Sequence, residues 1–179
     1  MTWLTPPAAT EFTLTNAPTL ETENLILRSH EARDIEPLIA FLTDQDRAAG
    51  FGAYGNRHDA WRWGALSVGH WHIYGYGYFT IEDKASGQPA GITGIWNPDG
   101  WPEPELGWVV FDGFEGRGVA YEAAARARDW AYGDLGFTTL TSNIVPGNTR
   151  SIRLAERLGA WCEREYQNVY MGAELLYRH

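Results

Sequence analysis

The stretch "ELGWVVFDGFEGRGVAYEAAARARDWAYGDLG", residues 105–136, decides the fold. Its first seven residues form an apolar run that is typical of a strand buried on both faces. Small and apolar side chains then recur every three or four residues, which predicts an amphipathic helix that begins near Gly118 and packs closely on a sheet. Gly116, Arg117 and Gly118 lie between the strand and the helix.

The turn before this helix has the chemistry of an anion site. The first turn of a helix presents unpaired backbone N–H groups at the positive end of its dipole. Glycines let the backbone approach phosphate oxygens, and Arg117 adds a positive charge. A pyrophosphate is therefore the expected ligand, and the competing interpretation is a turn that binds nothing. The lysine of a P-loop and the spacing of a dinucleotide-binding βαβ unit are both absent.

The flanking segments predict a single α/β (α+β) domain. Strand patterns occur at 24–28, 76–83, 90–96, 138–145, 160–165 and 174–179, and helical patterns occur from 34, less certainly from 58, and at 148–159. Two glycines weaken the helix from 58. Residues 1–18 are rich in Thr, Pro and Ala, so we expect an N-terminal arm there and one domain over 19–179.

Composition and charge exclude several classes of function. The net charge of −9, with only 14 Lys and Arg, argues against nucleic-acid binding and favours a cationic or amine partner. No apolar run reaches the roughly 20 residues needed to span a bilayer. The single cysteine, Cys162, cannot form an internal disulfide, and no signal-peptide pattern is present. We expect a cytoplasmic protein that binds neither nucleic acid nor membrane.

Three segments carry a resemblance to a known family. "EGRGVA", residues 115–120, resembles the pyrophosphate-binding signature of the GNAT superfamily of acyl-CoA N-acyltransferases: Gly118 and Ala120 match, and Glu115 replaces the usual Gln or Arg. "PGNTRSIRLAERLGA", residues 146–160, is similar to the Asn-x-x-Ser helix of the branch that includes ribosomal-protein N-terminal acetyltransferases, with Ala160 in place of an aromatic residue. "LETENLILR", residues 20–28, is similar to the first strand of that branch. The resemblance covers roughly residues 20–178.

The resemblance implies a fold and a cosubstrate. It implies a mixed central sheet of about six to seven strands, flanked by about four helices, with a splay between strands 4 and 5, here 105–111 and 139–144. Acetyl-CoA would lie in that splay, and no metal is implied. The implied cofactor-binding residues are Val109, Val110, Phe111, Gly116, Arg117, Gly118, Val119, Ala120, Asn148 and Ser151.

Two residues are the catalytic candidates. The resemblance places Ser151 where it can protonate or hydrogen-bond the departing thiolate, and a simple cap interaction at the start of its helix is the alternative. Glu105 can act as a general base if burial raises its pKa, and a solvated carboxylate at the strand edge is the alternative. Many relatives carry a tyrosine acid seven positions after the asparagine, but Ala155 stands there in this sequence.

The aromatic and histidine residues leave two interpretations open. Four tryptophans either form an acceptor pocket or fill the core: Trp61, Trp63, Trp96 and Trp101. His70 and His72 favour a structural or pocket-wall role over metal binding, because no further ligand cluster accompanies them.

The sequence thus predicts an acetyl-CoA-dependent N-acetyltransferase. It would transfer the acetyl group directly, in a ternary complex, to a small-molecule amine or a protein N-terminus. A non-catalytic CoA-binding or scaffold protein with the same fold is the alternative, and a longer acyl group or a hydroxyl acceptor is a third possibility. We expect a monomer or a homodimer.

Overall fold

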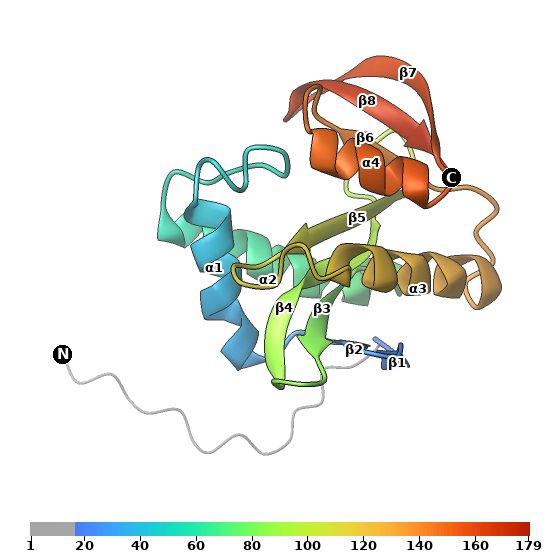
Figure 1. Ribbon diagram of the computed structural model, residues 1–179. Coiled ribbons are helices and arrows are strands. Elements are labelled where there is room, and N and C mark those ends of the chain that lie inside the picture. Colours follow the sequence, from blue (N-terminus) through green and yellow to red (C-terminus); the bar gives the residue numbers. More distant parts are fainter. Residues whose placement is uncertain (1–16) are drawn as a thin grey trace.

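One mixed sheet organises the chain in the computed structural model, which describes residues 17–179 (Figure 1). The eight strands run in the order β1-β2-β3-β4-β5-β6-β8-β7, and only β5 and β6 are parallel neighbours. Their bounds are Leu20–Glu21 (β1), Leu25–Arg28 (β2), Tyr78–Asp83 (β3), Gln88–Trp96 (β4), Glu105–Val110 (β5), Thr141–Ile144 (β6), Trp161–Asn168 (β7) and Gly172–Arg178 (β8).

The mixed α/β fold is confirmed, and the strand count is slightly higher than predicted. The additional strand is β1, whose two residues pair with β2. Two residues are too few to show the alternation by which a strand is recognised in a sequence. Of the predicted N-terminal arm, residues 1–16 lie outside the described residues.

Four α-helices and a short 3-10 turn cover the sheet. They are Ala32–Asp34 (η1), Ile35–Thr43 (α1), Arg57–Tyr74 (α2), Val119–Gly133 (α3) and Thr149–Arg157 (α4). The uncertain helix, α2, forms in full: the Asn56 side chain caps it by accepting a hydrogen bond from the Asp59 N–H, and Gly64 lies against Leu38 of α1. A glycine there lets the two helices approach closely, which offsets its low helix propensity. No helix within residues 17–179 is long and apolar enough to cross a membrane.

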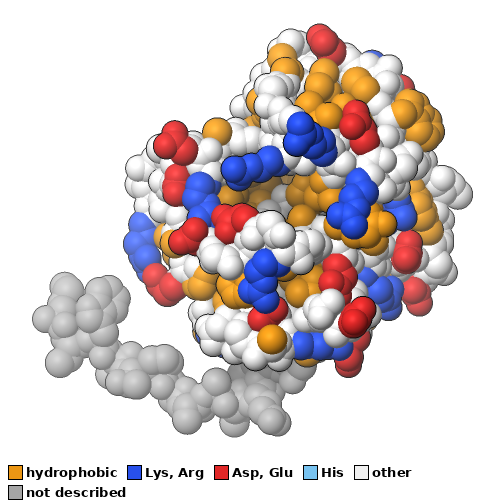
Figure 2. Space-filling model, viewed as in Figure 1, with side chains coloured by type: hydrophobic (Ala, Val, Ile, Leu, Met, Phe, Trp, Pro, Cys, Tyr) orange, Lys and Arg blue, Asp and Glu red, His pale blue; other side chains and the backbone are white. Residues whose placement is uncertain are grey.

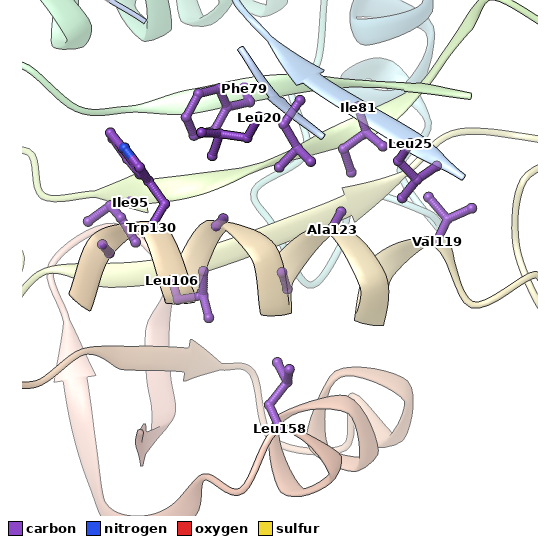
Figure 3. Close-up of a cluster of buried hydrophobic side chains, with 14 of the residues drawn as sticks. Leu20, Leu25, Phe79, Ile81, Ile95, Leu106, Val119, Ala123, Trp130 and Leu158 are labelled. Carbon is purple, nitrogen blue, oxygen red and sulfur yellow. The ribbon is translucent and has the colours of Figure 1, made fainter. Parts of the chain in front are cut away.

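Two layers of hydrophobic side chains hold the helices on opposite faces of the sheet. The alanine-rich face of α3 packs against strand residues that include Phe79, Ile81 and Leu106, as Figure 3 shows. On the other face, α1 and α2 pack against Tyr78 and Val109, together with Ile92 and Trp96 of β4. Because side chains alternate along a strand, neighbouring residues of β3 and β5 thus belong to different layers.

His70 and two of the tryptophans belong to the second layer. The ring of His70 stacks on Trp96, with 4.4 Å between ring centroids, and its Nδ1 lies 2.8 Å from the Tyr76 carbonyl oxygen. Burial lowers the pKa of His70, so its ring is neutral near pH 7. Trp63 and Trp96 fill the core, whereas Trp61 and His72 are exposed on α2. The structural role for His70 is confirmed.

The parallel strands β5 and β6 separate after a single residue pair. Glu105 pairs with Thr141. One residue further along, the strands are joined by a side chain: the Ser142 Oγ donates a hydrogen bond to the Leu106 carbonyl oxygen at 2.7 Å. Beyond this bond, no further residue pair joins β5 to β6 among the described residues. The expected splay is therefore present between these strands.

Candidate active site

A small pocket lies in the split between β5 and β6, and the residues that line it come from both faces of the sheet. Glu105 and Gly107 face the layer of α1 and α2, whereas Trp108 faces α3 and α4. The residues that line the pocket are Gly50, Phe51, Tyr78, Glu105, Leu106, Gly107, Trp108, Ser142, Asn143, Ile144, Asn148 and Ser151. The two predicted catalytic residues, far apart in sequence, thus share one pocket.

Glu105 is a half-buried carboxyl held by two side chains. The Trp101 indole donates to its Oε2, and the Asn143 Nδ2 donates to the same oxygen at 3.1 Å. Burial raises the pKa of Glu105 to about 7, and the charge of Glu174 adds to this rise, while the hydrogen bonds from Trp101 and Asn143 oppose it. A carboxyl that titrates near pH 7 can accept a proton from a substrate and release it to solvent.

Trp101 connects this carboxyl to the rim of the pocket. It lies on the β4–β5 loop, and its ring packs on Tyr170 in the β7–β8 turn with 5.8 Å between centroids. Met171 of the same turn lies near Gly52 of the α1–α2 loop. These contacts connect three loops near Glu105. Of the four tryptophans that the sequence suggested for an acceptor pocket, Trp101 is the one that hydrogen-bonds to a candidate catalytic residue.

Ser151 enters the pocket from the first turn of α4. Asn148 caps this helix, since its Oδ1 accepts a hydrogen bond from the Ser151 backbone N–H at 3.3 Å. The Ser151 hydroxyl takes no part in the cap: its Oγ accepts from the Trp108 indole at 3.4 Å. This arrangement leaves the hydroxyl hydrogen free to donate to a ligand.

Asn143 has an amide oxygen without a partner. Its side chain is 8% exposed, and its Oδ1 makes no hydrogen bond to any described residue. The opposite end of the amide is fixed, because its Nδ2 donates to Glu105. A buried acceptor without a partner is costly, so this oxygen is suited to receive an N–H group from a ligand.

The glycine turn before α3 has the geometry of an open cradle. Gly116 and Gly118 have φ values of 73° and 83°, in the left-handed region that favours glycine, and nothing lies within 4 Å of the position that a Cβ would take on either. No side chain caps the helix. Its first N–H groups are therefore available to an anion.

Two arginines lie beside the turn, and the sequence identified only one of them. Arg117 pairs with Asp83 at 3.1 Å. Arg47, from the α1–α2 loop, pairs with Glu115 and with Asp112 and donates to the Val110 carbonyl at 3.3 Å. Figure 2 shows a hollow on this face, between α4 and the loop before α3, with hydrophobic side chains on its floor and both basic and acidic side chains along its rim.

The strand pairing corrects one expectation about β5. The Phe111 N–H donates to Ala90 of β4, and a Cβ on Gly91 would collide with the Val109 carbonyl oxygen, so the backbone groups of Val109 face β4. Alternate residues of an antiparallel pair point their backbone groups to opposite sides. The groups that face the split are therefore those of Trp108 and Val110.

The fold and the split sheet together define an acetyltransferase. Residues 24–160 match the family model described as the acetyltransferase (GNAT) domain, and the chain belongs to this family. An acetyltransferase from Agrobacterium tumefaciens str. C58 is 35% identical, with a TM-score of 0.83 over 91% of this chain and 94% of that one. The ribosomal-protein-S5-alanine acetyltransferase from Vibrio fischeri, 17% identical, shares the fold with a TM-score of 0.71 over 91% and 96% of the two chains.

A relative of stated activity matches part of the chain. The L-2,4-diaminobutyric acid acetyltransferase of Streptomyces coelicolor is 43% identical over 86 residues, which are 44% of this chain and 50% of that protein.

Proposed function

We propose that the protein transfers the acetyl group of acetyl-CoA to a primary amine, directly and within a ternary complex. The observation that carries this proposal is the placement of Glu105 and Ser151 in one pocket, on opposite faces of the split sheet. A transfer from thioester to amine needs a base for the amine and a hydrogen-bond donor for the thiolate. In this proposal Glu105 is the base and Ser151 is the hydrogen-bond donor.

The cosubstrate fits the open edge of β5. Backbone groups of Trp108 and Val110 are directed at the split, so a pantetheine arm can pair with them as an added strand. Asn148 lies in the same pocket at the start of α4. The turn at Gly116 and Gly118 accommodates a pyrophosphate at the helix N-terminus. Arg47 also contacts Val110 and Glu115, so it is a residue that the pantetheine or the pyrophosphate would meet.

The acceptor is proposed to be an amine on three grounds. An alkylammonium group has a pKa of about 10, so it needs a base before it can attack, and the Glu105 carboxyl titrates near pH 7. The free Asn143 oxygen is an acceptor for an amine N–H. The relative from Streptomyces coelicolor is named for a diamine substrate, L-2,4-diaminobutyric acid.

Each step is assigned to a residue of this chain. Glu105 removes a proton from the ammonium group, and the amine nitrogen then attacks the acetyl carbonyl carbon. The N–H of Trp108 donates to the carbonyl oxygen as negative charge develops there. As the carbon–sulfur bond breaks, Ser151 donates a hydrogen bond to the thiolate, which takes the remaining excess proton from the new amide nitrogen.

Calorimetric titration with acetyl-CoA, and with CoA for comparison, tests the cosubstrate. Binding in the micromolar range is expected, and Gly118→Trp should abolish it by covering the N–H groups of the turn. Gly136→Trp is the matched control, because Gly136 also has a left-handed φ, 73°, and open space around it, but follows α3. Equal loss in both variants would contradict the assigned cradle.

Turnover is then tested with acetyl-CoA and a panel of amines: L-2,4-diaminobutyrate, spermidine, ribostamycin and a peptide with an N-terminal alanine. Release of the CoA thiol with any of them supports the proposed reaction. Tight acetyl-CoA binding without turnover of any amine would instead favour a CoA-binding scaffold.

A further inference from the structure

Tyr78 of β3 places a buried hydroxyl in the same pocket. Its side chain is 2% exposed. Its ring is held by three aromatic neighbours, with centroid distances of 5.9 Å to Phe51, 5.7 Å to Trp63 and 5.4 Å to Trp96. A ring packed on several sides has one orientation, so the position of the hydroxyl is fixed by the core.

The hydroxyl takes the space of a missing side chain on β5. A Cβ built on Gly107 would lie 2.0 Å from the Tyr78 oxygen, so the hydroxyl sits directly over the Gly107 backbone. Both residues line the pocket. Within residues 17–179, no hydrogen bond satisfies this hydroxyl. Its oxygen is not among the fully buried atoms that lack a partner, and Tyr78 lines the pocket, so the hydroxyl is placed to donate to a ligand there.

This position is next to the amide that we assign to the acetyl carbonyl. Gly107 and Trp108 share a peptide bond, and the Trp108 N–H faces the split. An oxygen bound to that N–H is one peptide unit away from the Gly107 backbone that the Tyr78 hydroxyl covers. Burial, together with the charge of Glu105, raises the pKa of Tyr78 well above its ordinary value, so the group remains a hydrogen-bond donor at every pH of interest.

We propose that the Tyr78 hydroxyl is a second donor to the acetyl carbonyl oxygen, a catalytic role that rests on the proposed function. When the amine nitrogen bonds to the carbonyl carbon, the π electrons move to this oxygen, and Tyr78 hydrogen-bonds to it without giving up its proton. When those electrons reform the double bond, the carbon–sulfur bond breaks and the thiolate leaves. The enzyme thus has two donors, one from the backbone and one from a side chain.

Tyr78→Phe tests the role, because it removes the oxygen and keeps the ring. The expected result is a fall in kcat of roughly 10²-fold, the usual effect of losing one such donor, with unchanged KM for the amine and unchanged affinity for acetyl-CoA. Tyr177→Phe is the matched control: Tyr177 is also buried, at 5% exposed, but it packs in the cluster beneath α4. The control should retain the wild-type kcat and melting temperature.

A second measurement requires no acceptor. Infrared difference spectra of bound [1-13C]acetyl-CoA report the carbonyl stretch, which a hydrogen bond lowers. The stretch should move to higher frequency in Tyr78→Phe and remain unchanged in Tyr177→Phe. This readout separates the two proposals, because it depends on acetyl-CoA binding but not on the choice of amine.

Three results would overturn the role of Tyr78: an unchanged kcat, a change confined to the KM for the amine, or an unchanged carbonyl stretch. If the wild-type protein fails to bind acetyl-CoA, both this role and the proposed function are rejected. If it binds and the stretch is the same in wild type and Tyr78→Phe, only the role of Tyr78 is rejected.

Discussion

Replacing Glu105 with Gln removes the proposed base while keeping its size and its place in the hydrogen-bond network. With a pKa of about 7, the wild-type carboxyl is half ionised at neutral pH. Each pH unit below this value lowers the ionised fraction about tenfold, so kcat at pH 5 should be about 100-fold below its plateau. An ordinary glutamate would still be mostly ionised at pH 5. Glu105→Gln should lower the plateau by roughly 10²–10⁴-fold and abolish the acid limb.

The same substitution has a second, independent effect on stability. The folded-state pKa of about 7 exceeds the unfolded value of 4.5, so the folded protein binds this proton more tightly. Stability is therefore greatest below pH 4.5 and falls as pH rises to 7, by at most about 3 kcal/mol from this group. Glutamine carries no charge and avoids this loss. Glu105→Gln should consequently raise the melting temperature more at pH 8 than at pH 5.

The assay is kcat against pH from 5 to 9 with saturating acetyl-CoA and amine, joined to thermal melts at both ends of that range. Glu103→Gln is the control, because Glu103 pairs with Arg178 near the same strand but lies outside the pocket. The control should keep the acid limb. An acid limb that persists unshifted in Glu105→Gln would refute the assignment of Glu105 as the base.

Three other substitutions examine the surroundings of the pocket. Ser151→Ala should lower kcat about tenfold, the cost of one hydrogen bond to a charged group, and leave CoA affinity intact; steady-state kinetics with an unaltered kcat would reject its role at the thiolate. Glu174→Gln should shift the acid limb to lower pH, because the Glu174 charge helps to raise the pKa of Glu105; a pH profile with the limb still at 7 would contradict this coupling. Gly50→Ala places a Cβ 2.4 Å from the Asn148 Nδ2 and should disturb the cap of α4, at a cost of about 1 kcal/mol; an unchanged melting temperature would show that the cap tolerates the methyl group.

The sequence predicted the parts of the site that lie on regular elements. Glu105, at the start of an apolar strand, and Ser151, in a capped helix, are recognisable by pattern and by resemblance, and the structure brings them into one pocket. The glycine turn before α3 was also recognisable, from its two glycines ahead of an amphipathic helix and from its resemblance to the family signature. What the sequence could not give was the raised pKa of Glu105, because it depends on burial and on Glu174, which is distant along the chain.

Tertiary packing brings the remaining residues of the site into the pocket. Tyr78 and Asn143 lie on other strands, and Arg47 lies in a loop with no recognisable motif, so their proximity follows only from strand order and loop path. The sequence prediction that the backbone of Val109, and not that of Trp108, faces the split was wrong for a related reason. The hydrogen-bond register of a strand decides which of its backbone groups face each neighbouring strand. The register cannot be read from an apolar run such as that of β5.

A pocket that is lined from both faces of a sheet lets the two halves of the proposed reaction evolve separately. In the proposed reaction, Glu105, Asn143 and the loop that carries Trp101 serve the amine, whereas Ser151 and the turn before α3 serve the thioester. Mutations in the β7–β8 turn, which contacts Trp101, can therefore alter the choice of amine while the proposed binding site of the acyl donor stays intact. Duplicated copies of such a gene could diverge toward new acceptors without first losing their common donor.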